Sequence, residues 1–254
     1  MANKRILVLV PHPDDEVVGA GAALMRALDA GDECHALYLT NGVPARETLW
    51  PWHRPGYGTR VARRWAEAEQ VAKRLGLNEA GRLDIPTRHL RFFLAEAEGL
   101  IRDCLADIEA EELWVPAWEG AHQDHDCANF LASRIDGCSV LEFAEYNNAG
   151  GQTNSQAFPE ILGTEQILEL SPEEQAAKRD LLGLYRSEQA NLAFIESARE
   201  CFRPLPAHDY ARPPHPGVLF HARFRRFGWH PRVDGTDPAE VRAGLAAYSP
   251  EKST

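Results

Sequence analysis

The residues that decide the fold are 4–16, which read KRILVLVPHPDDE. Ile6 to Val10 form a continuous apolar run rich in β-branched side chains, and such a run predicts a central parallel strand buried on both faces. An apolar helical pattern follows from about Val17 to Ala30, and Gly31 stands where such a helix ends. A buried strand that leads straight into a helix is typical of an α/β protein.

The next part of the chain repeats this alternation of strand-like and helix-like segments. Strands are predicted at residues 34–40, 83–85, 112–116 and 139–143, and helices at residues 60–75, 89–108 and 127–134. Alternating strands and helices form βαβ units around a parallel sheet. We therefore expect an α/β fold with a mostly parallel sheet and helices on both faces.

The pattern weakens after Tyr146. The clearest later element is a helix that begins at Ser171, where a serine, a proline and a glutamate stand at the positions of a capping box. Less regular segments suggest a strand within 160–170, a proline-rich connection at 203–216 and an edge strand at 218–224. No repeat or linker forces a division. We expect a single domain over residues 1–254, with a core at about 4–170 and a C-terminal helix and extension at about 171–254.

Composition excludes some partners. The chain has 254 residues and a formal net charge of −11. Nucleic-acid binding needs clustered Lys and Arg, so this balance argues against nucleic acid as the main partner. The longest early apolar run is only Ile6 to Val10, which is too short for a signal sequence or a membrane span, and we expect a cytoplasmic protein. The sequence leaves the oligomeric state open, a homo-oligomer included.

Two polar clusters follow predicted strands. The first is His12-Pro13-Asp14-Asp15-Glu16, and the second is His122-Gln123-Asp124-His125-Asp126. Ligands of open parallel sheets bind beyond the carboxyl ends of the strands, so the two clusters can converge. Singly, these residues would be helix caps or surface histidines. Together they offer the nitrogen and oxygen ligands of a catalytic zinc site, with further groups for acid–base work.

The two clusters resemble the signatures of the PIG-L (LmbE-like) de-N-acetylases. The first cluster matches one family motif, and His122-Gln123-Asp124-His125 has the form His-x-Asp-His of the second. A weaker helix element, Arg-x-x-Glu, is matched by Arg64 and Glu67, eight residues before Leu75-Gly76. The resemblance covers roughly residues 4–143 and is thin from Asn147 onward.

The resemblance implies a Rossmann-like fold and a divalent metal, usually zinc, although another such as Fe²⁺ remains open. It implies hydrolysis of an N-acetyl group from an amino sugar or glycoconjugate, which releases acetate. Carried over by position, it implies a metal held by His12, Asp15 and His125.

The resemblance also implies roles beside the metal. Asp14 would be the general base, and His122 the acid or oxyanion stabiliser, with Asp124 orienting that imidazole. Arg64 would contact polar groups of the sugar. One departure is clear: some members place a Tyr two residues before the first His of the second motif, and this chain has Gly120 there.

Substrate recognition is less specified. Trp50, Trp52 and Trp118 flank the expected site, and their rings suit either packing or stacking on a sugar; Trp118 is the candidate substrate contact. The loop at 41–58 and the part after Asn147 are expected to set the substrate. Alternatives remain: an amidase acting on a thiol conjugate or antibiotic intermediate, a metal-dependent phosphoesterase, or a sugar-binding module without catalysis.

Overall fold

The computed structural model describes residues 3–248. The strands of its main sheet are β1 (Arg5–Val10), β2 (Glu33–Tyr38), β3 (Asn78–Arg82), β4 (Glu112–Pro116), β5 (Ser139–Phe143), β8 (Gln166–Glu169) and β9 (Arg199–Pro204), and β6 (Tyr146–Asn147) and β7 (Asn154–Ser155) form a separate pair. The helices are α1 (Asp15–Asp29), α2 (Tyr57–Leu75), α3 (Leu94–Ile108), α4 (Gln123–Ala132), α5 (Pro172–Leu182), α6 (Gln189–Leu192) and α7 (Pro238–Ala247).

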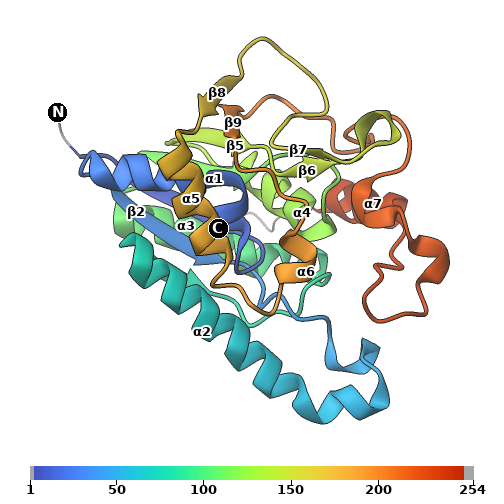
Figure 1. Cartoon of the computed structure of the whole chain (residues 1–254). Coiled ribbons are helices and arrows are strands. Elements are labelled where there is room, and N and C mark those ends of the chain that lie inside the picture. Colours follow the sequence, from blue (N-terminus) through green and yellow to red (C-terminus); the bar gives the residue numbers. More distant parts are fainter. Residues whose placement is uncertain (1–2, 249–254) are drawn as a thin grey trace.

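The seven strands of the main sheet lie in the order β3-β2-β1-β4-β5-β9-β8 (Figure 1). The first five in sequence pair in parallel, whereas β9 pairs antiparallel with both β5 and β8. The prediction of a mostly parallel sheet is therefore confirmed. The strand order reverses direction at β1 and β4, so the crevice beyond their carboxyl ends is where such folds place ligands.

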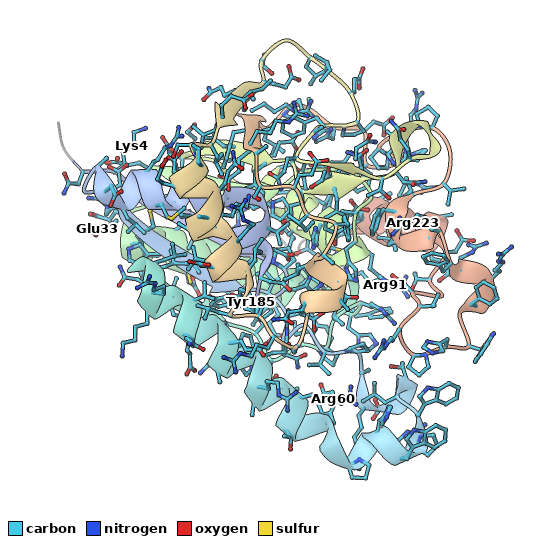
Figure 2. The ribbon with its side chains drawn as sticks, in the orientation of Figure 1. Lys4, Glu33, Arg60, Arg91, Tyr185 and Arg223 are labelled. Carbon is cyan, nitrogen blue, oxygen red and sulfur yellow. The ribbon has the colours of Figure 1, made fainter. Side chains whose placement is uncertain are left out.

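Alternate residues of β1 face two different cores. Ile6, Val8 and Val10 pack in one apolar cluster with residues of α1, α2 and α5. Leu7 and Leu9 pack in the other with residues of α3, α4 and α7. Because both faces are covered, the strand is apolar throughout, as expected of a buried parallel strand. Tyr185 belongs to the first cluster and lies just beyond α5, toward α2 (Figure 2).

Helix α1 packs closely on the sheet. A side chain at Gly19 would overlap the Phe143 ring at the end of β5, so the glycine is explained by helix–sheet contact. The loop before α1 is held by the segment after β2, because the Thr40 hydroxyl donates to the Pro11 carbonyl at 2.7 Å. These contacts hold the first polar cluster directly above the carboxyl end of β1.

Several predicted elements differ from the structure. The third strand is Asn78–Arg82 instead of 83–85, and it pairs with β2 through an irregular register. Helix α4 begins at Gln123 and not at 127, because His122 caps it. Residues 218–224 hold a 3₁₀ turn instead of an edge strand.

Three elements of the C-terminal part were not predicted: β9, the short helix α6, and α7. Strand β9 lies inside the main sheet, between β5 and β8, although its residues fall within the expected extension. Its sequence carries Arg199, Glu200 and Arg203, which hid a strand that is mostly buried. Helix α7 was also missed, and it closes the core beside α4. Among residues 3–248, no helix is both long enough and apolar enough to cross a membrane.

Candidate metal centre

Three side chains from two distant segments meet at the carboxyl ends of β1 and β4. His12 Nδ1 lies 3.1 Å from His125 Nε2 and 3.1 Å from Asp15 Oδ2. His125 Nε2 also lies 3.1 Å from Asp15 Oδ2, so the three atoms form a nearly equilateral triangle. Tetrahedral zinc ligands at about 2.0–2.1 Å stand roughly 3.3 Å apart, which is close to this spacing. The three residues predicted to hold a metal are therefore together.

The other nitrogen of His12 is held by Asp124. His12 Nε2 lies 3.0 Å from Asp124 Oδ2, and this contact turns Nδ1 toward Asp15 and His125. Burial alone would lower the pKa of His12, but Asp15 and Asp124 outweigh it and raise that pKa to about 10. A carboxylate on the far nitrogen is the usual partner of a metal-binding histidine. Asp124 thus orients His12 first, whereas the sequence had assigned it to His122, whose Nδ1 is 3.6 Å away.

His125 has a matching carboxylate that the sequence did not reveal. Its Nδ1 lies 3.3 Å from Glu145 Oε2, and both groups are almost completely buried. In the described chain neither this nitrogen nor either oxygen of Glu145 has a hydrogen-bond partner. Burial, followed by the charge of Asp15, raises the pKa of Glu145 well above its usual range.

Asp14 lies beside the triangle and is held by Arg64. Arg64 Nη2 is 3.1 Å from Asp14 Oδ2 and also donates to the Pro13 carbonyl. Both side chains are buried. Burial raises the pKa of Asp14 well above its usual range, although the Arg64 guanidinium opposes that shift. Asp14 also has a φ of 142°, a strained backbone position of the kind found at functional sites.

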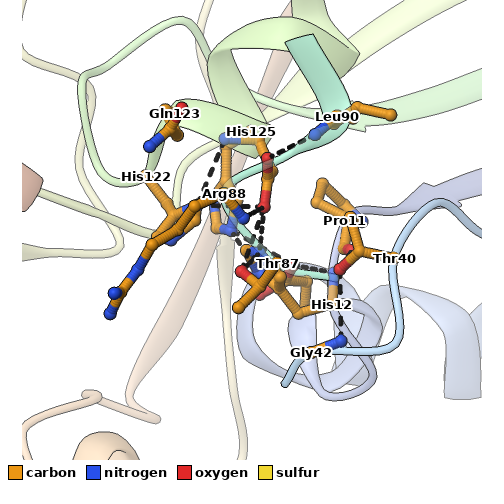
Figure 3. Close-up of polar contacts among 12 residues, drawn as sticks. Pro11, His12, Thr40, Gly42, Thr87, Arg88, Leu90, His122, Gln123 and His125 are labelled. Carbon is orange, nitrogen blue, oxygen red and sulfur yellow. Dashed lines mark hydrogen bonds and ion pairs between the residues drawn. The ribbon is translucent and has the colours of Figure 1, made fainter. Parts of the chain in front are cut away.

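His122 stands edge-on to His12, with ring centroids 4.4 Å apart. Its Nδ1 accepts a hydrogen bond from the Asp124 amide at 3.1 Å, so the ring proton of a neutral His122 resides on Nε2. Burial, followed by the charge of His12, lowers the pKa of His122 well below its usual value. The side chain is thus a neutral donor at the rim of the group (Figure 3).

Thr87 and Arg88 also contact His12 or Asp124, and the sequence predicted neither. The Thr87 hydroxyl lies 2.9 Å from His12 Nε2 and donates to Asp124 Oδ2 at 3.0 Å. The Arg88 amide donates to the same oxygen at 2.6 Å. Figure 3 shows Thr87 among the histidines, while the Arg88 side chain extends away from them. The only sequence signal was their place in a loop after a short predicted strand.

Gly120 and Tyr146 bear on the departure noted in the sequence. Gly120 has a φ of +69°, and a Cβ there would lie 2.9 Å from a Leu219 methyl carbon, so a tyrosine at that position would strain the backbone and require Leu219 to move. Tyr146 lies nearby, with its ring edge-on to that of His125 and the ring centroids 6.1 Å apart. Burial, followed by the charge of Glu145, raises the pKa of Tyr146 well above its usual value, which keeps the phenol neutral.

The tryptophans expected to flank the site differ in how exposed they are. Trp118 is buried in the core and packs edge-on against Tyr210 at 4.9 Å. A ring covered in this way offers no face to a substrate, which corrects the assignment of Trp118. Trp50 and Trp52 stack on each other with ring centroids 5.3 Å apart and planes 7° apart. Trp52 is exposed.

The donor set fits a divalent cation. Two imidazole nitrogens and one carboxylate oxygen face one another, and an imidazole pair at this distance needs a proton or a cation between them. Around them lie the buried carboxylates of Asp14, Asp124 and Glu145, of which Glu145 has no hydrogen-bond partner in the described chain. Uncompensated buried carboxylates are costly without a positive charge. We conclude that the residues present suit zinc or a similar ion.

Comparison with known proteins shows the family of this chain. The family model described as PIG-L: GlcNAc-PI de-N-acetylase matches residues 7–135, just over half of the 254 residues. The chain belongs to this family. Over 151 residues it is 26% identical to the diacetylchitobiose deacetylase of Thermococcus kodakarensis, a match that covers 58% of this chain and 53% of that protein. The chain therefore spans about half the length of the curated relative that it matches.

Solved structures share the fold. A deacetylase of the teicoplanin biosynthesis pathway superposes with a TM-score of 0.62 at 18% identity, over 79% of this chain and 97% of that one. The 4-carboxy-2-hydroxymuconate hydratase of Pseudomonas putida KT2440 superposes with a TM-score of 0.54 at 16% identity, over 81% of this chain and 97% of that one. Because the second protein is a hydratase, this likeness concerns the fold and does not decide the reaction.

Proposed function

We propose that this protein is a zinc-dependent N-deacetylase that removes an acetyl group from an amino sugar or glycoconjugate. The observation that carries the proposal is the triangle of His12 Nδ1, Asp15 Oδ2 and His125 Nε2, with 3.1 Å between each pair and the separate carboxylate of Asp14 beside it. Membership of the PIG-L family and the 26% identity to a diacetylchitobiose deacetylase support the same reaction.

The metal site divides the work between neighbouring residues. His12, Asp15 and His125 would hold the ion, and zinc supplies Lewis acidity, which polarises an acyl oxygen and lowers the pKa of a water molecule. Asp124 holds His12 from behind at 3.0 Å, and Glu145 lies 3.3 Å from Nδ1 of His125, where its carboxylate would orient that ring once a metal is bound.

Asp14 is the proposed proton carrier. Asp14 lies outside the triangle, so it is not a metal ligand and its carboxylate stays available as a base. Arg64 fixes its position. Amide hydrolysis needs a base that takes a proton from water and an acid that protonates the leaving nitrogen. A carboxyl group whose pKa is raised by burial can do both in turn.

His122 and Tyr146 are the proposed donors to the acyl oxygen. His122 carries its proton on Nε2 because Nδ1 accepts from the backbone, and Tyr146 is a neutral phenol. Neutral donors aimed at an oxygen that gains charge stabilise the transition state without themselves losing a proton. In this scheme Tyr146 supplies the phenol that some family members carry at the position of Gly120.

Acetate release with defined metals tests the proposal. Metal-free protein is loaded with Zn²⁺ or Fe²⁺ and assayed on a panel of N-acetylated sugars, free and conjugated, for acetate and free amine. We expect one bound metal per chain and acetate release that depends on it. Absence of both metal and acetate would favour a sugar-binding module, and release of phosphate from phosphoesters would favour a phosphoesterase.

A further inference from the structure

Glu16 ends the first polar cluster, and its side chain stands outside the metal triangle although it is completely buried. Its Oε2 accepts a hydrogen bond from the Asp14 amide at 3.1 Å. That amide belongs to the residue whose φ of 142° is strained. A strained backbone persists only where the surrounding groups hold it in place. Glu16 is therefore one of the groups that keep Asp14 where it is.

Glu16 is held in turn by Tyr185. The Tyr185 hydroxyl donates to Glu16 Oε1, while the Asp14 amide donates to the other oxygen of the same carboxylate. Tyr185 is completely buried, and burial, followed by the charge of Glu16, raises the pKa of its phenol well above the usual value. The hydroxyl thus keeps its proton and acts as a donor. Without it, one buried carboxylate oxygen of Glu16 would lose its partner, which is costly.

The same tyrosine also contacts the second support of Asp14. Arg64 holds the Asp14 carboxylate, and the Arg64 Cζ atom lies 5.6 Å from the centre of the Tyr185 ring. Glu16 therefore holds the amide of Asp14, Arg64 holds its carboxylate, and Tyr185 contacts both of these supports. A residue that only filled space in the core would have no reason to contact both.

The chain around Tyr185 is fixed on α2. Ser187 donates from its amide and its hydroxyl to the two oxygens of Glu67, at 3.1 Å and 2.5 Å. Glu67 lies one helical turn after Arg64, whose Nη1 donates to the Ser187 hydroxyl at 3.4 Å. Figure 2 shows Tyr185 between the end of α5 and α2. This segment lies outside residues 7–135, which the family model matches.

We propose that Tyr185 is a positioning residue for Asp14. By holding Glu16 and contacting Arg64, it keeps the Asp14 carboxylate beside the metal triangle in the orientation that proton transfer needs. The inference rests on the proposed function, in which Asp14 carries the proton. It assigns a role at the site to a segment that contributes no side chain to the triangle.

The kinetic test is Tyr185→Phe, which removes the hydroxyl and keeps the ring. On zinc-loaded protein with N-acetylglucosamine or its β-1,4-linked dimer, whichever is hydrolysed faster, kcat should fall about 10- to 100-fold with KM within about twofold, because a displaced proton carrier slows the chemistry and leaves binding intact. Bound zinc should stay at the wild-type level, because Asp15 is held separately by the His12 amide at 2.7 Å.

Tyr38→Phe is the matched control. Tyr38 is buried in the same apolar cluster as Tyr185, and within the described residues its hydroxyl has no hydrogen-bond partner. Its removal should change kcat by less than about twofold, because no hydrogen bond is lost.

A second background separates positioning from a general structural role. If Tyr185 acts through Asp14, Tyr185→Phe should lower the residual kcat of Asp14→Asn by less than about twofold, because the group being positioned is already gone. An equal loss from Tyr185→Phe in both backgrounds would assign the tyrosine to the stability of the fold and overturn the inference.

Hydrogen exchange of the metal-free protein tests the inference without the reaction. The Asp14 amide, followed by NMR, should exchange at least about fivefold faster in Tyr185→Phe than in the wild type or Tyr38→Phe, because Glu16 no longer holds it firmly. If no sugar releases acetate but this difference appears, the deacetylase proposal fails and Tyr185 still positions Asp14.

Equal exchange at Asp14 in wild type and Tyr185→Phe overturns the inference, and so does an unchanged kcat where the wild type is active. Should Tyr185→Phe not fold, Glu16→Gln takes its place. Its amide oxygen faces only one of the two donors, and the same loss of kcat and the same faster exchange are then expected.

Discussion

Two buried ionic groups of this molecule differ in how completely their charges are satisfied. Lys178 and Glu200 are both fully buried, and Lys178 Nζ donates to Glu200 Oε1 at 2.6 Å and to the Val18 carbonyl at 2.9 Å. Glu200 also accepts from two amides of α1. This pair is closed, and it ties α5 and β9 to α1. Nothing about it calls for a ligand.

The candidate metal centre is the counterpart in which the buried charges are not fully paired. Its carboxylates outnumber its cationic partners, and in the described chain both oxygens of Glu145 and Nδ1 of His125 have no hydrogen-bond partner. Burial makes such groups expensive, so they persist where a ligand or a reaction uses them. The difference between a satisfied pair and an unsatisfied cluster distinguishes a structural ionic group from a functional one.

The largest expected effect is on catalysis. Asp14→Asn should reduce kcat by about 10² to 10⁴-fold, because the side chain keeps its shape but can no longer take a proton. Bound zinc, measured by elemental analysis, should remain at the wild-type level. His12→Ala should do the reverse and lose the metal first. Loss of zinc from Asp14→Asn would show that the roles of the two neighbouring aspartates are exchanged.

The next effect concerns the closed pair. Lys178→Met should destabilise the metal-free protein by about 3–5 kcal/mol, because Glu200 would keep a buried charge without its partner. Denaturant unfolding measures this change. The double variant Lys178→Met/Glu200→Gln should recover part of the stability, and Arg179→Ala, an exposed neighbour, should change it by less than about 0.5 kcal/mol. A loss below about 1 kcal/mol for Lys178→Met would contradict the comparison.

Removing the charge of Glu145 should lower the affinity for zinc and leave the stability of the fold unchanged. Glu145→Gln should weaken zinc binding by about 10- to 100-fold, because His125 would lose the carboxylate behind it. Competition with a chromogenic chelator measures the affinity, and Glu173→Gln, an exposed acid of α5, is the control. Unchanged affinity would mean that Glu145 serves packing alone.

The sequence predicted the parts of this comparison that depend on local order. His12, Asp15 and His125 could be predicted to lie together because each motif is contiguous and follows a strand, and the sheet brings strand ends together; their role as metal ligands stays a prediction. Asp124 was linked to His122 alone, because spacing places the two side by side. In the structure its amide does donate to His122, while its carboxylate contacts His12, which spacing could not predict. Glu145 could not be predicted from the sequence, because a single acidic residue after a strand is usually a solvent-exposed side chain. Strand β9 was hidden for a related reason: its charged residues are paired inside the protein, and pairing is invisible in one dimension.

The last expected effect is a pH dependence at Glu119, which is buried and accepts a hydrogen bond from the Glu145 amide. Its carboxylate accepts from the amides of Glu145 and Tyr146 and from the Asn147 side chain. Burial raises the pKa of Glu119 to about 8, which those hydrogen bonds only partly oppose. Because the folded state holds this proton more tightly than the unfolded state, whose pKa is near 4.5, folding stability falls as pH rises between the two values.

Glu119→Gln removes that dependence. The free energy of unfolding of the metal-free wild type, minus that of the variant, should fall as pH rises from about 5 to 8, by at most roughly 1.4 kcal/mol per pH unit. Above pH 8 the difference should be constant. Denaturant unfolding at several pH values measures it, and subtraction cancels the titration of all other groups. A difference that is flat throughout this window would show that Glu119 is ionised in the folded protein, and this acid would then belong with the satisfied group of Lys178 and Glu200.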